Sequence, residues 1–379
     1  MEEEKNNSPT LESYEETIRE QLRPYFLDPR QDYPEPYHLL EYNGVPFSKV
    51  GGLAAISGQK KNGKSFVLTQ LMAAMLSDGN ERTQKFLPGL TVPERTIEYL
   101  GHQPKVLYID TEMEKLSSAK VLRRVHWLCG WDMKTPNERF SVLWLKNMPK
   151  DTDIRPHKQR YDLIRKAIDI EQPDAVFIDG IRDLLSSIND EETAVQILEE
   201  LGSLAEERQM CIWNALHQNP SRNNDGEDKM RGWAGTELGN KVSDTLISIK
   251  KKEANGVTFT VKQQDARDKD LDDWKFQVTD DAGNLGVPKI IGGDINRVPI
   301  VNDPVEDIRR WIEIGARNLN WPLSRKDVKK KVFGDIGGQK NDGKQQADLQ
   351  VAMNLNMLVE STLKSGGYYM LMPAEEYPF

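Results

Sequence analysis

Residues 53–65 read Leu-Ala-Ala-Ile-Ser-Gly-Gln-Lys-Lys-Asn-Gly-Lys-Ser, and this stretch decides the fold of the chain. An apolar run typical of a buried strand ends at Gly58, and residues 58–65 match G-x-x-x-x-G-K-[ST] at every fixed position. A helical pattern begins at Phe66. Glycines let the backbone close around phosphate oxygens with amide N–H groups pointing inward, and the next helix adds partial positive charge. The stretch therefore predicts a phosphate-binding loop between a strand and a helix.

The residue types in this loop predict the ligand. Lys64 is expected to reach the β- and γ-phosphates of a nucleoside triphosphate, and the Ser65 hydroxyl is expected to bind Mg²⁺. ATP and Mg²⁺ are therefore the predicted cofactors. The other residues expected to line the nucleotide are Gly58, Lys61, Asn62, Gly63 and Phe66.

A second stretch, residues 338–345, has two glycines and a lysine at the same spacing. Gln345 stands where the magnesium-binding hydroxyl should be, and no long apolar run precedes the stretch. We interpret it as a loop between two helices and not as a second nucleotide site.

The composition excludes several classes of protein. The chain has 379 residues, of which 37% are hydrophobic and 29% charged, and no apolar run approaches the ~20 residues of a membrane span. The N-terminus lacks the basic and apolar regions of a secretory signal. Two cysteines, Cys129 and Cys211, are too few for a metal cluster or a disulfide framework, so a cytoplasmic protein without membrane partners is expected. The net charge of −9 argues against a surface covered in DNA-binding charge, although a ring of subunits can still create a positive channel.

The chain is expected to have three parts. Residues 1–44 are acidic and then rich in proline and tyrosine, with one helix over 11–22 and an extended arm. This arm is either a disordered tail or a segment that packs on a neighbouring subunit. Residues 45–295 alternate strands with helices and predict a mostly parallel sheet. The strand candidates are 53–57, 105–110, 141–145, 174–179 and 210–216, with helices that include 158–170 and 192–208. Strands at 242–250, 257–263 and 274–279, separated by turn-forming residues, predict an antiparallel extension.

The third part, residues 296–379, has the pattern of a small separate module. Helices are expected over 305–319, 324–333 and 344–360, with Ser324 as an N-cap, followed by a hairpin over 361–372. Three helices and a β-ribbon resemble a winged helix-turn-helix, which implies binding to duplex DNA. The alternative is a protein-binding adaptor of the same shape. The basic run 325–331 is local, because basic and acidic residues are equal in number over 303–379.

The second half of a nucleotide site needs a carboxylate that holds the magnesium shell. Asp179 follows an apolar strand, at the end where doubly wound sheets bind ligands. The next residue is Gly180 and not the glutamate that would activate water, so we expect the base from elsewhere. Glu112 follows the strand 105–110 and is the preferred candidate, with Glu114 as the alternative. Either residue can instead be a capping or ion-paired surface glutamate.

Polar residues also follow the strand 210–216. His217 is expected either to sense the γ-phosphate and relay its state to the next loop, or to be a hydrogen-bonded histidine at the edge of the core. The loop 219–232 is long and polar, and such loops in compact domains are usually functional or mobile. Its basic residues are expected to face nucleic acid unless the loop is simply solvated. They are Arg222, Lys229 and Arg231.

The order of these features resembles a RecA-like P-loop core and, within that group, hexameric plasmid helicases of the RepA-like type. Residues 178–185, 229–241 and 265–268 are similar to ATPases carried by bacterial plasmids and mobile elements. The resemblance spans residues 45–280. It implies a homo-oligomeric ring, expected to be a hexamer, with ATP between subunits and a basic residue of one subunit completing the site of its neighbour. Arg267 is the candidate for this role, with Lys262 on the same strand and Arg231 as second choice; the alternative is that all three are ordinary surface charges.

The resemblance also implies that the loops over 181–192 and 219–230 face single-stranded DNA in the ring channel. The first loop departs from this pattern, because four acidic residues accompany only one cation, Arg182. Two hypotheses follow. The chain is an ATP-dependent DNA helicase or translocase of a mobile genetic element, or it is an ATP-switched DNA-binding regulator or loader that does not unwind. Phosphate-loop chemistry unrelated to DNA, such as a small-molecule kinase, is disfavoured by the long loop and the absence of an obvious lid.

Overall fold

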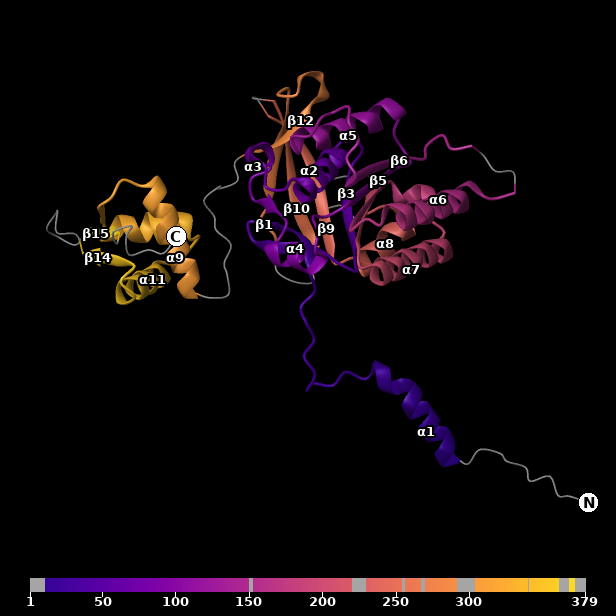
Figure 1. Cartoon of the computed structure of the whole chain (residues 1–379), viewed down its shortest axis with the longest axis horizontal. Coiled ribbons are helices and arrows are strands. Elements are labelled where there is room, and N and C mark those ends of the chain that lie inside the picture. Colours follow the sequence, from indigo (N-terminus) through magenta and orange to yellow (C-terminus); the bar gives the residue numbers. More distant parts are fainter. Residues whose placement is uncertain are drawn as a thin grey trace, which may run out of the picture. The chain divides into compact units, whose positions relative to one another are not determined.

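The computed structural model describes residues 11–149, 153–219, 230–253, 256–266, 270–291, 304–339, 341–360 and 368–371 (Figure 1). The chain divides into two units, residues 1–36 and residues 37–379, and each is treated by itself. The first unit contains α1 (Leu11–Leu22) and the short helix η1 (Arg23–Tyr25), which confirms the helix predicted over 11–22. Within the described ranges, no helix combines the length and the apolar character needed to cross a bilayer.

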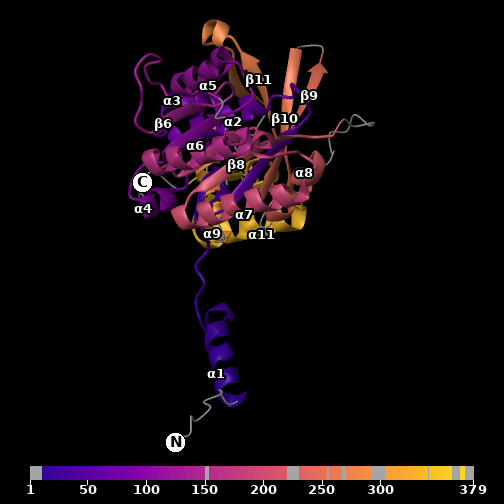
Figure 2. The same ribbon diagram turned by 90° about the vertical axis from the view of Figure 1, so that its right-hand side faces the viewer.

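A nine-stranded sheet organises the larger part of the second unit. Its described strands, in spatial order, are β12 (Val287–Ile291), β11 (Trp274–Thr279), β10 (Gly256–Ala266), β9 (Asp244–Glu253), β3 (Leu53–Gly58), β8 (Cys211–His217), β7 (Ala175–Asp179), β5 (Val106–Asp110) and β6 (Phe140–Trp144). The pairs from β9 to β6 are parallel, whereas β10, β11 and β12 pair antiparallel. Figure 2 shows β9, β10 and β11 side by side. This sheet fits the predicted RecA-like α/β core with its antiparallel extension.

Alternating side chains of the strands supply two separate hydrophobic clusters, one on each face of the sheet. In β3, Ala54 and Ile56 belong to one cluster, and Leu53 and Ala55 belong to the other, as expected for a strand whose successive side chains point to opposite faces. The first face is covered by α2 (Lys64–Leu76), α5 (Lys115–Leu128) and the small sheet of β2 (Val45–Lys49), β1 (His38–Tyr42) and β4 (Leu90–Thr91). The second face is covered by α6 (Pro156–Glu171), α7 (Glu191–Arg208) and α8 (Gly232–Lys241), which lie together in Figure 1. Such two-sided cover explains why the parallel strands are apolar throughout.

The parallel register brings the chemically important strand ends to one edge. Gly58 is the register partner of His217, and Asp110 is the partner of Asp179. The last residues of four strands that are distant in sequence therefore meet where open α/β sheets bind their ligands.

The C-terminal region contains α9 (Pro304–Asn318), β13 (Leu323–Ser324), α10 (Arg325–Asp327), the π-helical segment η4 (Val328–Ile336), α11 (Asp342–Asn354), β14 (Leu358–Glu360) and β15 (Tyr368–Leu371). Strand β15 pairs antiparallel with both β13 and β14. Trp311, Phe333 and Leu349 from the three helical segments share one buried cluster. Ser324 accepts a hydrogen bond from the amide of Asp327, which confirms it as an N-cap.

Several predicted boundaries are wrong. The third C-terminal helix ends at Asn354 instead of residue 360, because Asn356 turns the chain with φ +52° and residues 358–360 form β14. Residues 343–345 of the second glycine-lysine stretch lie in α11 instead of a loop. Most of the predicted hairpin over 361–372 lies outside the described residues.

Several elements of the core were not predicted. They include the short helix α3 (Glu81–Phe86), helix α4 (Glu94–Leu100), the turn η3 (Gly283–Leu285) and strand β12. Strand β12 contains Pro288, which an edge strand tolerates.

Candidate nucleotide site

The loop between β3 and α2 has a backbone that requires its glycines. Gly63 has φ +85° and Lys61 has φ +65°. A Cβ on Gly63 would lie 2.7 Å from Cδ1 of Phe259, and a Cβ on Gly58 would lie 2.7 Å from the carbonyl oxygen of Ser248. No side chain caps the N-terminus of the 13-residue helix α2. Its first N–H groups are therefore unused by a cap and suit an anionic ligand.

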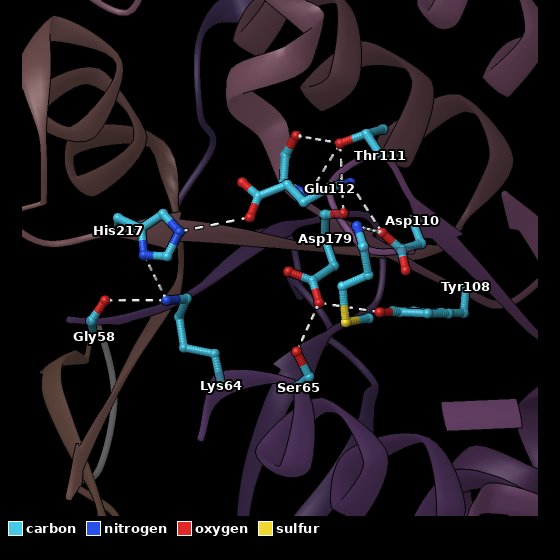
Figure 3. Close-up of polar contacts among 11 residues, drawn as sticks. Gly58, Lys64, Ser65, Tyr108, Asp110, Thr111, Glu112, Asp179 and His217 are labelled. Atoms are coloured by element: carbon cyan, nitrogen blue, oxygen red, sulfur yellow. Dashed lines mark hydrogen bonds and ion pairs between the residues drawn. The ribbon is translucent and has the colours of Figure 1, made fainter. Parts of the chain in front are cut away.

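Lys64 is 8% exposed and lies beside the end of β8. Its ammonium Nζ donates to the carbonyl oxygen of Gly58 at 3.1 Å and lies 2.9 Å from Nδ1 of His217 (Figure 3). Burial lowers the pKa of Lys64, while the nearby charges of Asp179 and Glu112 oppose that shift. The lysine is thus held at the loop by two neutral acceptors that a phosphate can replace.

The predicted magnesium residues are in direct contact. The Ser65 hydroxyl donates to Oδ2 of Asp179 at 3.0 Å, and the Tyr108 hydroxyl donates to the same oxygen at 3.0 Å. Burial raises the pKa of Asp179 to about 6, and the charges of Asp110 and Glu112 add to the rise. A hydroxyl and a carboxylate are oxygen ligands of the kind Mg²⁺ prefers. This pair beside the glycine loop therefore fits the Mg²⁺ ion that accompanies a nucleoside triphosphate.

Asp110 shapes the turn that presents Glu112. Its Oδ1 accepts hydrogen bonds from the amides of Glu112 and Met113, both at 2.9 Å, and its Oδ2 accepts from the Ser118 hydroxyl. The Thr111 amide donates to the carbonyl oxygen of Asp179 at 2.9 Å, which ties the end of β5 to the end of β7. The turn therefore holds the Glu112 backbone in a fixed place.

The Glu112 carboxylate lies against Gly180, the residue after the magnesium aspartate. A Cβ on Gly180 would overlap Oε1 of Glu112 and lie 2.9 Å from its Cδ. Oε2 of Glu112 lies 3.5 Å from Nε2 of His217. Since the Lys64 ammonium donates to Nδ1, the imidazole proton belongs on Nε2, where it faces Glu112. The hydrogen bond from His217 lowers the pKa of Glu112, with smaller contributions from Lys64 and Arg182.

Residues 33–222 match the model of a family described as AAA domain. The chain belongs to this family. No curated protein matches the sequence. Among solved structures, a KaiC-like protein from the hyperthermophilic archaeon Pyrococcus horikoshii OT3 is similar at 12% identity and a TM-score of 0.42, over 65% of this chain and 92% of that one.

The AAA-domain chain is a P-loop ATPase, because membership of this family implies nucleotide binding and hydrolysis, typically with Mg²⁺. The predicted loop residues Lys61 and Asn62 lie in the turn before α2, and the Asn62 carbonyl accepts a hydrogen bond from the Ser248 hydroxyl. Phe66 packs near Phe259, with ring centroids 6.3 Å apart. The antiparallel extension thus supports the phosphate loop of this ATPase directly.

Among the described residues predicted to face DNA or a neighbouring site, Arg182 adds only its charge to this network, and Arg231 joins it only through its backbone. Arg182 is exposed on the turn η2 (Ile181–Leu184), whose Ile181 and Leu184 are buried. Lys262 forms an ion pair with Asp273 at 3.6 Å. Arg231 is exposed, and its amide donates to the carbonyl oxygen of His217 at 2.9 Å. The remaining candidates lie outside the described residues; they are Arg222, Lys229 and Arg267.

Four residues that build the site of this AAA-domain ATPase were not among the predicted site residues. Tyr108 bonds the magnesium aspartate, and the other three fix the turn of Glu112; these are Asp110, Thr111 and Ser118. The sequence does contain a pattern that indicates two of them. Tyr108 and Asp110 are two residues apart at the end of one strand, so their side chains lie on the same face of the sheet. Polar residues on the ligand edge of an otherwise apolar strand indicate a site.

Proposed function

We propose that this ATPase is an ATP-dependent DNA helicase or translocase of a mobile genetic element, and that it hydrolyses ATP at the subunit interfaces of a hexameric ring. The observation that carries the catalytic part is the contact of Lys64, His217 and Glu112 beside the Ser65–Asp179 pair (Figure 3). The similarity of residues 45–280 to plasmid-borne ATPases supports the DNA-directed part.

The residues of the site divide the chemistry. Lys64 would move from Gly58 and His217 to the β- and γ-phosphates, where its positive charge stabilises the transferred phosphoryl group. Glu112 has a lowered pKa and is ionised at neutral pH, so it can orient and accept a proton from the attacking water. Ser65 and Asp179 would hold Mg²⁺, which neutralises charge that develops on the phosphate oxygens. His217 would lose its lysine partner when the nucleotide binds.

His217 also supports a link between ATP and the next loop. The Arg231 amide donates to the His217 carbonyl oxygen, and Gln218 forms a β-bridge with Met230. Both ends of the loop over 219–230 are thus joined at the histidine that contacts Lys64. A change in the partners of His217 on nucleotide binding would reach the base of a loop that the family resemblance directs toward DNA.

The test measures phosphate release by the purified full chain with and without single-stranded DNA, together with its mass in solution. We expect hydrolysis that single-stranded DNA stimulates and an oligomer of ring size in the presence of ATP. Equal hydrolysis with and without DNA by a protein that stays monomeric at micromolar concentration would contradict the motor proposal.

A second candidate is an ATP-switched DNA-binding regulator or loader. Two observations favour it. The C-terminal region has a helix-turn-helix order of elements followed by two paired strands, and the loop over 181–192 buries apolar side chains while offering only Arg182 as a cation. A strand-displacement assay separates the candidates, because the regulator would bind duplex DNA without opening it.

A further inference from the structure

In the C-terminal region two helical segments follow each other in the chain order of a helix-turn-helix. The segment α10–η4 and helix α11 are joined by the short connection over 337–341. Both pack against α9 through the cluster that contains Trp311, Val332 and Leu349. In a helix-turn-helix, the first helix of the pair crosses the DNA backbone and the second lies in the major groove. By this order, α11 is the groove helix.

The outward face of α11 has the side chains that read bases. Leu349 and Ala352 are buried, whereas Lys344, Ala347, Gln350 and Asn354 are exposed along the opposite face. Glutamine and asparagine amides pair with adenine, lysine pairs with guanine, and an alanine methyl contacts the methyl group of thymine. The Gln350 amide donates to Oδ1 of Asn354 at 3.1 Å, which orients both side chains. A helix of 13 residues is about 20 Å long and fits the major groove.

The acidic residues of α11 do not interrupt this face. Asp342 forms an ion pair with Lys329 at 2.7 Å, and Asp348 is partly buried. The exposed stripe is therefore neutral apart from Lys344, which suits contact with base edges beside a charged backbone.

A basic groove of about 540 Å³ lies between α10–η4 and the first turns of α11. Four cations line it, namely Arg325, Lys326, Lys329 and Lys330. Lys329 is engaged by Asp342. Arg325, Lys326 and Lys330 are exposed, and no carboxylate of the described residues forms an ion pair with them. Three exposed cations without an ion pair among the described residues, on the segment that precedes α11, match the backbone phosphates that such a helix crosses.

We propose that the C-terminal module binds duplex DNA with α11 in the major groove. Gln350 and Asn354 read base edges, and Arg325, Lys326 and Lys330 hold backbone phosphates. This inference rests on the proposed DNA-directed function but not on unwinding. It excludes A-form RNA as the ligand, because the narrow major groove of A-form helices does not admit a helix.

The first experiment measures the affinity of the full chain for a random-sequence DNA duplex of about 30 base pairs as a function of salt. Each phosphate contact contributes about 0.9 to the slope of log affinity against log salt. The triple variant Arg325→Gln, Lys326→Gln, Lys330→Gln should therefore make the slope shallower, reducing its magnitude by about 2.7. The matched control is the triple variant Lys166→Gln, Arg208→Gln, Lys241→Gln. It removes three ion-paired cations from helices of the ATPase core, and its slope should equal that of the wild type. Equal slopes for both triple variants would overturn the phosphate assignment.

The second experiment selects preferred duplexes from a random DNA pool and compares variants on the selected sequence. Gln350→Ala and Asn354→Ala should each weaken binding to the selected duplex on the order of tenfold and leave binding to the random pool unchanged. Gln196→Ala, at an exposed glutamine of α7, is the control and should bind as wild type. Unchanged preference in both α11 variants, or equal binding of an RNA duplex of the selected sequence, would refute the groove assignment.

ATP hydrolysis measured on the same proteins separates this inference from the proposed function. Lys64→Ala should lose hydrolysis and keep duplex binding, whereas the α11 variants should keep hydrolysis in the absence of DNA. If DNA does not stimulate hydrolysis but the α11 variants lose sequence preference, the motor proposal fails and this inference stands. If stimulation is present and the α11 variants bind as wild type, this inference alone fails.

Discussion

Replacement of Gly180 by alanine tests whether Glu112 orients the attacking water. Gly180 has φ −139° and ψ 127°, a conformation that any L-residue adopts, so alanine adds no backbone strain. The new Cβ would overlap Oε1 of Glu112 and lie 2.9 Å from its Cδ, so the carboxyl group must move by on the order of 1 Å before its nearest oxygen is in ordinary contact. The displaced atoms are the end of a flexible side chain, and the fold should tolerate their movement.

A shift of about 1 Å in a catalytic group costs on the order of 100-fold in rate. We therefore expect Gly180→Ala to lower kcat by roughly 10- to 100-fold, with little change in KM for ATP, because the phosphate loop and the Ser65–Asp179 pair are untouched. Steady-state phosphate release over a range of ATP concentrations measures both constants. Glu112→Gln should bind ATP normally and lose about 100- to 10,000-fold in kcat, the usual contribution of a general base.

Two comparisons make the test specific to Glu112. Gly202→Ala on α7 is the matched control, because its Cβ would meet only Cδ1 of Leu53 at 3.9 Å, and it should turn over as wild type. The double variant Gly180→Ala, Glu112→Gln should be no slower than Glu112→Gln alone, since both changes act on one group. A folded Gly180→Ala protein with wild-type kcat, or a double variant whose losses multiply, would refute the assignment of Glu112.

Three further predictions concern Lys64, Arg267 and Asp179. Lys64→Ala should abolish ATP hydrolysis in a phosphate-release assay, and a variant that retains more than a few per cent of wild-type turnover would contradict the role of the lysine. If Arg267 completes the site of a neighbouring subunit in the proposed ring, Arg267→Ala should be inactive alone but regain activity when mixed with Glu112→Gln, because the two defects would lie on opposite sides of a shared site. No rescue in mixed rings would exclude this role. The pKa of Asp179 is about 6 in the folded protein, against 3.8 for an unperturbed aspartate. Because the folded state holds this proton more tightly, the free energy of unfolding should fall by roughly 3 kcal/mol as the pH rises from about 4 to 6, and should stay level above pH 6. Asp179→Asn should remove that fall in Mg²⁺-free denaturation curves, and an unchanged pH profile would mean that the carboxyl is not buried as described.

The sequence predicts those parts of the site that lie on single strands or loops. Gly58 and Asp179 each end an apolar run, and the carboxyl ends of parallel strands share one edge, so their meeting follows from pattern alone. Contacts that depend on the pairing of distant segments were not predictable. Phe259 lies against Gly63 because β9 pairs with β3 and β10 pairs with β9, and no local pattern specifies that order.

The same limit explains the errors near the C-terminus. Residues 344–360 continue a helical pattern, yet β15 pairs with residues 358–360 and converts them into a strand. Long-range pairing overrides the local preference there. In contrast, the Ser324 cap depends only on the next three residues and was predicted correctly.

The charges of the site favour ATP that arrives with its metal ion. Asp110, Glu112 and Asp179 bring three carboxyl groups to one strand edge, and among the described residues there only the ammonium of Lys64 is a buried cation. The mutual repulsion of these carboxylates contributes to the raised pKa of Asp179. A free triphosphate would add negative charge to this edge, whereas a divalent cation held by Asp179 would relieve the repulsion and favour the ionised carboxylate. Metal and nucleotide would therefore each improve the site for the other, because the cation would compensate Asp179 while the phosphates would draw Lys64 from His217.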